Sequence, residues 1–515
     1  MVTIPIRPMI EKIESIRKEM IAEEWAYADK LGGLQEHYRE SARNLLHYLI
    51  LRKYDLRALQ EDLSSLGISS IGHSERYTLN NVTNILHLLY LLEGKRQEDL
   101  ESSGVRFSLN YPKSKSRLNE NTLALFGPAK VKGHTRIMVT LPSEAAEDYK
   151  FVRSLLKKGV ELLRINCSHD HPAAWGQMIA NIRKAEQELG VKGLVYMDLA
   201  GPKLRTGLIK PEKSSDKKKK KKSKGPFIQL FKGDLIEVHR EEILGKQGKN
   251  GKPSRISTTL PEVFKDIVPG QSIWFDDGKI GGIIKEASPD KLLVEINHAA
   301  IDGSKLRGDK GINLPDTDIH LPSLTDYDLE TLPFVAKHAD LVGYSFVRKP
   351  GDVKELQKRL QKLGREDVGV ILKIETREAF DNLPLLIFQA MKSEKMGIMI
   401  ARGDLAVEVG WSRIAEVQEQ IMWICEAAHM PYIWATQILE TLAKKGVATR
   451  AEITDAAYAA RAECAMLNKG PYILDAVDTL RNIDERMVAH HQKKMGALRP
   501  LHVAKRFFKA KKVVK

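Results

Sequence analysis

The stretch VGVILKIETREAFDNLPLLIFQAMKSEKMGIMIARGD (368–404) contains two short apolar runs with an amphipathic segment between them. The runs VGVILKIE (368–375) and MGIMIARG (396–403) have the length and aliphatic content of buried strands. Residues 376–391 place apolar side chains three and four positions apart, as a helix requires. Strands that are apolar on both faces and alternate with helices belong to parallel sheets covered by those helices. The stretch therefore predicts a β–α–β unit of an α/β protein.

The same unit recurs on both sides of this stretch. Each apolar run is followed by a helical stretch, and the further runs are RIMVTL (136–141), ELLRINC (161–167), GLVYMDL (193–199), ADLVGYSF (339–346), PYIWAT (431–436) and CAMLNKG (464–470). With the two runs above they make eight strand–helix units over ~250 residues, which is the size of a closed (β/α)8 TIM barrel. We predict this barrel for residues 126–206 and 311–488.

A long interruption separates the third unit from the fourth. Residues 207–310 contain short strand patterns with turn residues between them, in FIQLFKGDLIEVHR (227–240), QSIWFDDGKIGGIIKEA (271–287) and KLLVEINHAA (291–300). Such a pattern predicts a small antiparallel β-barrel. The insertion leaves the main barrel at the carboxyl end of a strand, where active sites of this fold lie, so we expect it to act as a lid.

Residues 1–125 show helical spacing of apolar residues and no catalytic grouping, which predicts an α-helical packing or assembly module. The formal net charge of +15 raises the question of a nucleic-acid partner. However, much of the excess lies in the lysine-rich run 213–224 and in the basic tail 489–515. Like-charged blocks are usually disordered, so we expect a solvated loop and a tail that can touch an acidic partner, rather than a nucleic-acid site.

The N-terminus lacks the uninterrupted apolar core of a secretory signal, and no apolar run reaches the ~18–20 residues of a membrane span. The three cysteines, Cys167, Cys425 and Cys464, are too scattered for a disulfide framework or a zinc site. We therefore expect a cytoplasmic protein with buried thiols and no membrane partner.

Polar residues gather at the carboxyl ends of the predicted strands, where catalytic groups of such barrels lie. They are Arg164, Asn166, Ser168, His169, Asp198, Lys203, Arg205, Lys373, Glu375, Arg402, Gly403, Asp404 and Thr436. The carboxylates Glu375 and Asp404 follow adjacent strands, and we expect them to share one Mg²⁺ or Mn²⁺ ion. Arg164, Arg205 and Lys373 would surround that ion with positive charge. This arrangement suits phosphoryl transfer, whose transition state spreads negative charge over three oxygens. Taken singly, each residue also fits an ordinary ion pair or turn.

Seven motifs lie in the predicted barrel and lid. They are RINCSH (164–169), DLAGPKLRTG (198–207), WFDDGKI (274–280), GINLP (311–315), KIET (373–376), ARGDLAVEV (401–409), and ATQILETL (435–442) followed by TRAEITDAA (449–457). In this order, over ~350 residues, they resemble the pyruvate kinase family. The resemblance implies a short, atypical member that transfers the phosphoryl group of phosphoenolpyruvate to ADP, giving pyruvate and ATP in the last step of glycolysis.

The resemblance also implies a role for individual residues. These roles are catalysis for Lys373, Arg164, Thr436 and Arg205; metal binding for Glu375 and Asp404; substrate binding for Gly403, Asp404, Thr436 and Lys373; and nucleotide binding for Asn166, His169 and Lys469. Gly403 and Asp404 would open a helix whose amides hold the substrate carboxylate. Thr436 would also lie near the proton path to the enolate carbon.

Lys203 implies a difference in ion requirement. Part of the family has Glu at this position and needs K⁺ beside the phosphates, whereas another part has Lys and does not. The threonine that often helps to bind K⁺ is Leu199 here. We predict that Lys203 substitutes for the potassium ion and that activity does not require K⁺, which assays in Na⁺ or tetramethylammonium buffer would test.

The chain departs from the family pattern at three places. The turn after the first strand is Leu141-Pro142-Ser143 and lacks a glycine, the loop after the eighth strand lacks the usual Ser-Gly-Glu-Thr before Lys469, and a family lysine is Ala200. These changes imply weak or altered nucleotide affinity. The tail 489–515 stands where the family has a C-terminal regulatory domain. This implies no effector regulation through such a domain, and a homo-oligomer formed through non-standard contacts of residues 1–125.

Two other interpretations remain open. The first is a catalytically weakened, pyruvate-kinase-like scaffold or regulatory protein that binds an acidic partner, which the shortened loop after the eighth strand favours. The second is another metal-dependent reaction of phosphoenolpyruvate or a 2-oxo acid on a related barrel, although such enzymes lack a lid inserted after the third strand.

Overall fold

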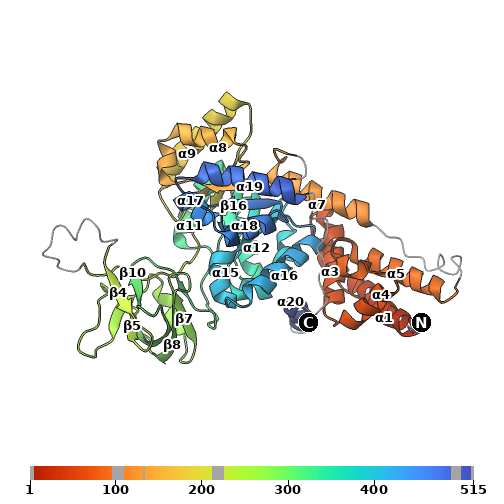
Figure 1. Ribbon diagram of the computed structural model, residues 1–515, viewed down its shortest axis with the longest axis horizontal. Helices are drawn as coiled ribbons and strands as arrows, with labels where there is room; N and C mark the ends of the chain where they lie inside the picture. Colours follow the sequence, from red (N-terminus) through yellow and green to blue (C-terminus); the bar gives the residue numbers. More distant parts are fainter. Residues whose placement is uncertain (1–4, 96–108, 132–133, 212–224, 489–499, 512–515) are drawn as a thin grey trace.

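The computed structural model describes residues 5–95, 109–131, 134–211, 225–488 and 500–511. Figure 1 shows three parts side by side, with the N-terminal helices at one end, a barrel in the middle and the inserted lid at the other end. Within the described residues, no helix combines the length and apolar character that a membrane span requires.

The central part is a closed barrel of eight parallel strands in the order β1-β16-β15-β14-β13-β12-β3-β2. The strands are β1 (Arg136–Thr140), β2 (Leu162–Asn166), β3 (Leu194–Asp198), β12 (Leu341–Tyr344), β13 (Gly369–Ile374), β14 (Met396–Ala401), β15 (Tyr432–Ile438) and β16 (Cys464–Leu467). Every residue of β13 and β14 is buried, as expected for strands covered on both faces. The predicted (β/α)8 barrel is confirmed.

Helices cover the outer face of the barrel. They are α8 (Tyr149–Lys157), α9 (Pro172–Leu189), α11 (Asp326–His338), α12 (Pro350–Lys362), α13 (Arg377–Asp381), α14 (Leu383–Ala390), α15 (Arg402–Val409), α16 (Ile414–Ala427), α17 (Glu440–Lys445), α18 (Arg450–Ala459) and α19 (Ile473–Val488). The helices α11 and α18 begin at capping boxes, Thr325 with Asp328 and Thr449 with Glu452, which satisfy amides at each helix start.

The described part of the lid contains eight short strands around a hydrophobic core of its own, and the last strand extends it beyond the predicted end at residue 310. They are β4 (Phe227–Leu230), β5 (Leu235–His239), β6 (Ser254–Ser257), β7 (Ser272–Phe275), β8 (Ile280–Ala287), β9 (Lys291–His298), β10 (Ser304–Arg307) and β11 (Ile312–Asn313). They form a six-stranded sheet, β11-β7-β8-β9-β5-β6, and a two-stranded sheet, β10-β4. The pairing is antiparallel as predicted, except that β5 and β6 run parallel, because the long connection between them brings the chain back to the same end.

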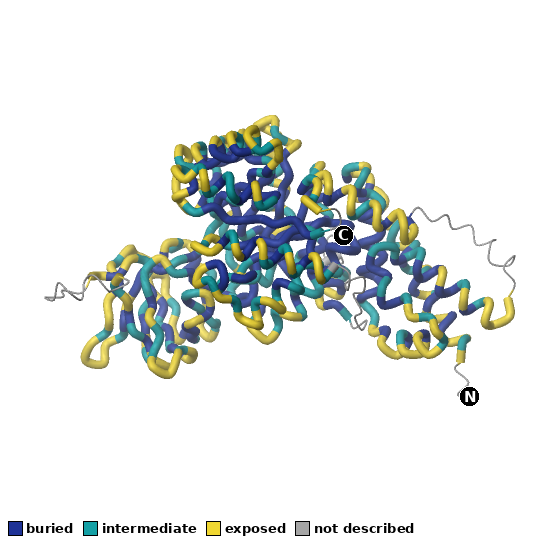
Figure 2. Tube along the Cα trace, turned by 45° about the horizontal axis from the view of Figure 1, so that its top comes forward, coloured by how far each residue is buried: buried dark blue, intermediate teal, exposed yellow. Residues whose placement is uncertain are grey.

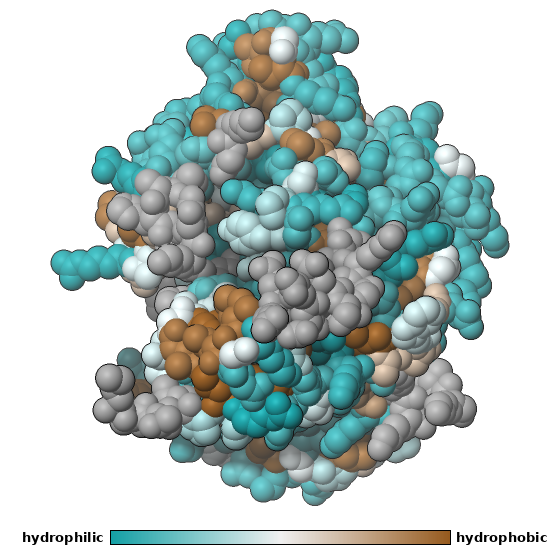
Figure 3. Space-filling model, turned by 90° about the vertical axis from the view of Figure 1, so that its right-hand side faces the viewer, coloured by the Kyte–Doolittle hydropathy of each residue, from teal (hydrophilic) through white to brown (hydrophobic). Residues whose placement is uncertain are grey.

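The N-terminal part is helical, as expected. Its elements are α1 (Ile6–Ala26), α2 (Ala28–Gly32), α3 (Arg39–Arg52), α4 (Arg57–Ser65), α5 (Thr78–Leu92) and α7 (Tyr111–Phe126). Its buried side chains join those of the barrel helices in one continuous hydrophobic core, which Figure 2 shows as dark blue tube running from these helices into the barrel. The outer surface of this end is mostly hydrophilic with some apolar areas (Figure 3), and α5 exposes the leucines Leu88, Leu91 and Leu92.

The end of α7 closes the bottom of the barrel. Leu125 and Phe126 are buried among side chains from the barrel interior. Glycines in two strands make room for Leu125, because a Cβ atom at Gly369 or Gly397 would lie 2.8 or 2.6 Å from its methyl groups. The barrel and the N-terminal part are therefore joined by direct packing in the barrel interior.

The expectation of a disordered basic tail is wrong for residues 502–511, which form the helix α20 (His502–Lys511). Leu501, Val503 and Phe507 are buried, so that apolar residues at helical spacing outweigh the positive charge around them. The ring of Phe507 packs against Tyr27 of the N-terminal part and Phe388 of α14. Residues 489–499 and 512–515 of the tail, and the whole lysine-rich run 213–224, lie outside the described residues.

Candidate active site

The carboxyl ends of the barrel strands bring together a set of buried charged side chains. Asp198, the last residue of β3, is 1% exposed and lies between two cations. It accepts a hydrogen bond from Arg164 Nε of the neighbouring strand β2 at 2.7 Å, and Lys373 Nζ of β13 is 3.4 Å away. Tyr196 donates a further hydrogen bond to it at 2.8 Å. Burial by itself raises the pKa of Asp198, but the positive charges of Arg164 and Lys373 outweigh burial and lower it, so Asp198 is held ionised.

The backbone of β12 leaves space for this carboxylate. A Cβ atom at Gly343 would lie 2.0 Å from Asp198 Oδ1, so only glycine fits there. Two residues further along, Ser345 Oγ accepts a hydrogen bond from Lys373 Nζ at 2.8 Å and donates one to the carbonyl oxygen of Leu199 at 2.7 Å. The strand β12 therefore positions both the carboxylate and the lysine.

Lys373 is the central cation of the cluster. Its ammonium lies 3.1 Å from Glu375 Oε1 in addition to its contact with Asp198. Burial lowers the pKa of Lys373, but the negative charges of Asp198 and Glu375 outweigh burial and raise it. For Glu375 the balance is reversed: burial raises its pKa above the usual range, Lys373 opposes the rise, and the negative charge of Asp404 adds to it. Because the charge of Asp404 acts on Glu375, the two carboxylates lie within electrostatic reach of each other.

Each of these two carboxylates has a further partner. The amide of Phe346 donates to Glu375 Oε2 at 2.7 Å. Asp404, in the first turn of α15, accepts two hydrogen bonds from the ammonium of Lys203, at 3.0 Å to Oδ1 and 2.9 Å to Oδ2. The predicted potassium substitute Lys203 thus lies at the same barrel mouth as the two predicted metal ligands, and it is paired with one of them.

The donor chemistry of the pair fits a hard divalent cation. Within the described residues, no group of three or more His, Cys, Asp or Glu side chains is gathered as a metal site. Two carboxylates that leave most positions to water and to substrate oxygens are the usual arrangement for Mg²⁺ with a phosphate ligand. Glu375 and Asp404 therefore suit a metal that is held jointly with a phosphorylated ligand.

The start of α15 lies beside Thr436. A Cβ atom at Gly403 would be 3.8 to 4.0 Å from three side-chain atoms of Thr436. The Thr436 hydroxyl is buried and has no hydrogen-bond partner among the described residues, and its backbone is left-handed, with φ of 66°. Arg402 fixes this segment, because its guanidinium donates to the carbonyl oxygens of Ala435, at 2.9 Å, and of Thr436. An unsatisfied hydroxyl beside the free amides of a helix start is suited to hold an anion.

The predicted nucleotide-binding residues Asn166, His169 and Lys469 lie at the end of β2 and after β2 and β16. Burial lowers the pKa of His169, and the positive charges of Lys469 and Arg205 lower it further, so these three side chains are within electrostatic reach. Asn166 Oδ1 accepts a hydrogen bond from the amide of Ser168 at 3.1 Å, and this bond stabilises the turn after β2. Arg205 does not join the Asp198 cluster: its guanidinium faces Asp309 of the lid, with a hydrogen bond of 3.3 Å to the carbonyl oxygen.

Three further residues at the site are not among the predicted ones. Ser345 lies in the strand motif GYSF (343–346), whose position at a carboxyl end is a usable signal. Thr140 accepts a hydrogen bond from Arg164 Nη1 at 2.9 Å, which no sequence spacing indicates. Glu408 is buried on α15 and accepts a hydrogen bond from Asn313 of the lid at 3.1 Å, a contact between segments far apart in sequence.

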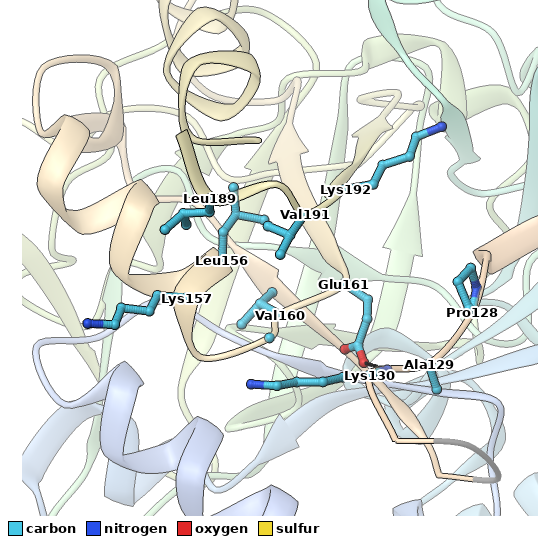
Figure 4. A pocket seen from close by; sticks show the side chains of 11 residues that line it. Pro128, Ala129, Lys130, Leu156, Lys157, Val160, Glu161, Leu189, Val191 and Lys192 are labelled. Atoms are coloured by element: carbon cyan, nitrogen blue, oxygen red, sulfur yellow. Dashed lines mark hydrogen bonds between the residues drawn. The ribbon is translucent and has the colours of Figure 1, made fainter. Parts of the chain in front are cut away.

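A separate cavity of about 330 Å³ lies at the amino ends of β1, β2 and β3 (Figure 4). Its apolar wall contains Leu156, Val160, Leu189 and Val191. Its carboxylate, Glu161, accepts hydrogen bonds from the amides of Lys130, at 2.9 Å, and Ile137, at 2.8 Å. None of the predicted site residues lines this cavity, which is at the opposite end of the barrel from the cluster.

Fold and site together define a (β/α)8-barrel protein with an inserted lid and a buried cluster of cations and carboxylates at the carboxyl ends of its strands. Residues 132–477 match the family model described as "Pyruvate kinase, barrel domain". The chain belongs to the pyruvate kinase family.

Individual relatives agree with this assignment. The chain is 31% identical over 372 residues to a pyruvate kinase of Bacillus licheniformis, a match that covers 70% of this chain and 59% of the relative. It is 32% identical over 354 residues to one of Clostridium acetobutylicum, covering 67% and 69%. It is 31% identical over 358 residues to one of Thermotoga maritima, covering 69% and 67%. The matches to the Bacillus and Staphylococcus saprophyticus relatives thus span little more than half of those proteins, at 59% and 56%.

Proposed function

We propose that this protein catalyses phosphoryl transfer from phosphoenolpyruvate to ADP. The supporting observation is the ammonium of Lys373, which is held in the barrel mouth by Asp198, Glu375 and Ser345. In this reaction the bond between phosphorus and the enol oxygen breaks, an oxygen of the terminal phosphate of ADP forms a bond to the phosphorus, and the enolate carbon takes up a proton. A fixed cation beside the transferring group stabilises the charge that develops on its oxygens.

Glu375 and Asp404 would hold the divalent ion, Mg²⁺ or Mn²⁺. When bound, this ion supplies positive charge to the phosphoryl oxygens and to the enolate. Burial prepares the pair for this role, because Glu375 is costly to ionise without a nearby positive charge. We also propose that activity requires this divalent ion and does not require K⁺.

The remaining residues would orient the substrates. Arg164, fixed by Asp198 and Thr140, would hold phosphoryl oxygens. The first amides of α15 at Gly403 would bind the substrate carboxylate together with the Thr436 hydroxyl, which has no hydrogen-bond partner among the described residues, and Thr436 would also pass a proton toward the enolate. Asn166, His169 and Lys469 would face the nucleotide.

The cluster at the barrel mouth favours this enzyme over a non-catalytic scaffold. Burying several charges costs free energy unless they pair, and a scaffold gains nothing from a lysine buried between two carboxylates. The short loop after β16, where Leu467 is followed by Asn468 and Lys469, supports the prediction of weak nucleotide affinity.

A coupled assay for pyruvate formation from phosphoenolpyruvate and ADP with Mg²⁺ tests the proposal. We expect activity in the parent protein and a loss of about 10²–10³-fold or more in Lys373→Met, because one preorganised charge at the transferring group contributes that much. A matched control is Lys392→Met, which changes an exposed lysine outside the mouth. Absence of pyruvate formation by the folded parent protein would instead favour the scaffold.

A further inference from the structure

The lysine that pairs with Asp404 occupies oxygens that the proposed metal also needs. Both oxygens of Asp404 lie within 3.0 Å of the Lys203 ammonium, and the two side chains are 15% and 25% exposed. A divalent ion bound to Asp404 and this ammonium cannot share the carboxylate without strong repulsion between them. Metal binding must therefore break the ion pair.

The backbone around Lys203 is fixed, whereas its ammonium is carried on a long side chain with several rotatable bonds. The buried carboxylate of Asp328 accepts hydrogen bonds from the amides of Ala200, at 2.8 Å, and Gly201, at 3.1 Å. The stem of Lys203 lies over Gly311, where a Cβ atom would be 3.3 Å from Lys203 Cε. The ammonium is thus carried on a flexible stem from a rigid base, and it can leave Asp404 without a movement of the lid.

We propose that Lys203 is a tethered competitor of the divalent cation for Asp404, and that metal binding releases its ammonium toward the substrate anion. This inference rests on the proposed metal site. In the absence of metal, the ammonium offsets the charge of the Asp404–Glu375 pair and lowers the affinity for the cation. Once released, it adds a positive charge beside the phosphate. Metal and anion binding therefore strengthen each other, and by linkage each does so by the same factor.

A titration of the anion-free protein with Mn²⁺ tests the competition directly. Electron paramagnetic resonance measures the concentration of free Mn²⁺, from which the dissociation constant follows. We expect Lys203→Met to bind Mn²⁺ about tenfold more tightly than the parent protein, because the variant keeps the packing over Gly311 and removes the competing charge. Lys203→Arg should retain the affinity of the parent. The control Lys310→Met removes a nearby lysine whose partner is Asp276, at 3.1 Å, and it should leave Mn²⁺ affinity unchanged.

Addition of phosphoenolpyruvate tests the second half of the proposal. It should increase Mn²⁺ affinity severalfold more in the parent protein than in Lys203→Met. Equal or weaker Mn²⁺ binding in Lys203→Met would overturn the inference, even if the parent protein forms pyruvate. Tighter Mn²⁺ binding in that variant would uphold the competition even if no pyruvate is formed, so that failure of the inference and failure of the proposed function can be told apart.

Discussion

Glu408 is a buried carboxyl group at the contact between α15 and the lid. Burial raises its pKa to about 7, and the negative charge of Asp404 contributes to the rise, while the hydrogen bond from Asn313 opposes it. The folded protein therefore holds a proton on Glu408 between pH 4.5 and 7, where the unfolded chain has released it. This contribution to stability is complete at low pH and is lost as pH rises to about 7.

We predict that Glu408→Gln abolishes this pH dependence. The variant mimics the protonated side chain and keeps an acceptor for Asn313, so it should match the parent near pH 5 and exceed it at pH 8 by up to about 3 kcal/mol. Urea unfolding at the two pH values measures the difference. An unchanged pH profile would show that the carboxyl group has its ordinary pKa.

At the scale of residues, the sequence indicated the charged cluster but not its pairing. Lys373, Glu375 and Asp404 follow strand motifs, and the (β/α)8 fold brings such positions to one end, so their convergence could be predicted. The ion pair of Lys203 with Asp404 could not be predicted, because the direction of a long side chain depends on the backbone path, which Asp328 fixes here. The position of Asp198 between two cations could not be predicted either, because it depends on which strands are neighbours.

The elements that join the N-terminal helices to the barrel meet at His429, in the turn between α16 and β15. Its ring contacts Ser41 of α3 at 3.0 Å and the carbonyl oxygen of Arg76 at 2.9 Å, so the nitrogen that faces the carbonyl carries the proton. Its own carbonyl oxygen accepts a hydrogen bond from Asn121 of α7 at 2.7 Å. Burial lowers the pKa of His429 to about 4, which keeps the ring neutral at this junction.

We predict that this histidine makes the junction sensitive to acid. The folded pKa is below the unfolded value of 6.5, so its stabilising contribution is present above pH 6.5 and is lost as pH falls toward 4. His429→Asn tolerates the left-handed backbone, with φ of 46°, and lacks the titrating group. Its free energy of unfolding should be lower by about 1–3 kcal/mol at pH 7 and should fall less between pH 6.5 and 4.

The exposed His502 provides the matched control, since its side chain is 62% exposed. His502→Asn should leave both the stability at neutral pH and the acid slope close to those of the parent. If His429→Asn kept the full acid slope, the acid sensitivity would belong to other groups.

Most elements of the barrel could be predicted because their patterns are local. Runs such as RIMVTL and MGIMIARG are apolar throughout, and the helices between them have clear periodicity. The parallel pairing of β5 with β6 and the helix α20 could not be predicted with the same rules. The first depends on the course of a long loop, and the second on burial of Phe507 against two parts of the chain that sequence alone does not bring together.

The described residues form three hydrophobic clusters, and two of them join the N-terminal helices to the barrel. One extends from the N-terminal helices through the outer layer of the barrel, a smaller one fills the barrel interior around Leu125 and Phe126 of α7, and the third lies inside the lid. Domains with separate cores unfold separately unless their interface is large. We predict two transitions in differential scanning calorimetry, one for the lid and one for the barrel together with the N-terminal helices.

Two fully buried side chains assign the transitions. Ile228→Ala in the lid should lower the midpoint of one transition only, and Leu49→Ala in α3 should lower that of the other, each through a loss of about 2–5 kcal/mol. If Leu49→Ala shifted a separate third transition and left the barrel transition unchanged, the N-terminal helices and the barrel would not unfold as one unit. That result would contradict the shared core.

The insertion of Leu125 into the barrel has a consequence for synthesis on the ribosome. The glycines that accommodate this side chain, Gly369 and Gly397, are translated roughly 250 residues after it, which at 5–20 residues per second is a delay of some tens of seconds. During that interval the helices made first have no partner for part of their apolar surface. The nascent chain must therefore be shielded from self-association until the sixth barrel strand has emerged, and a slower elongation rate would lengthen its exposure to chaperones.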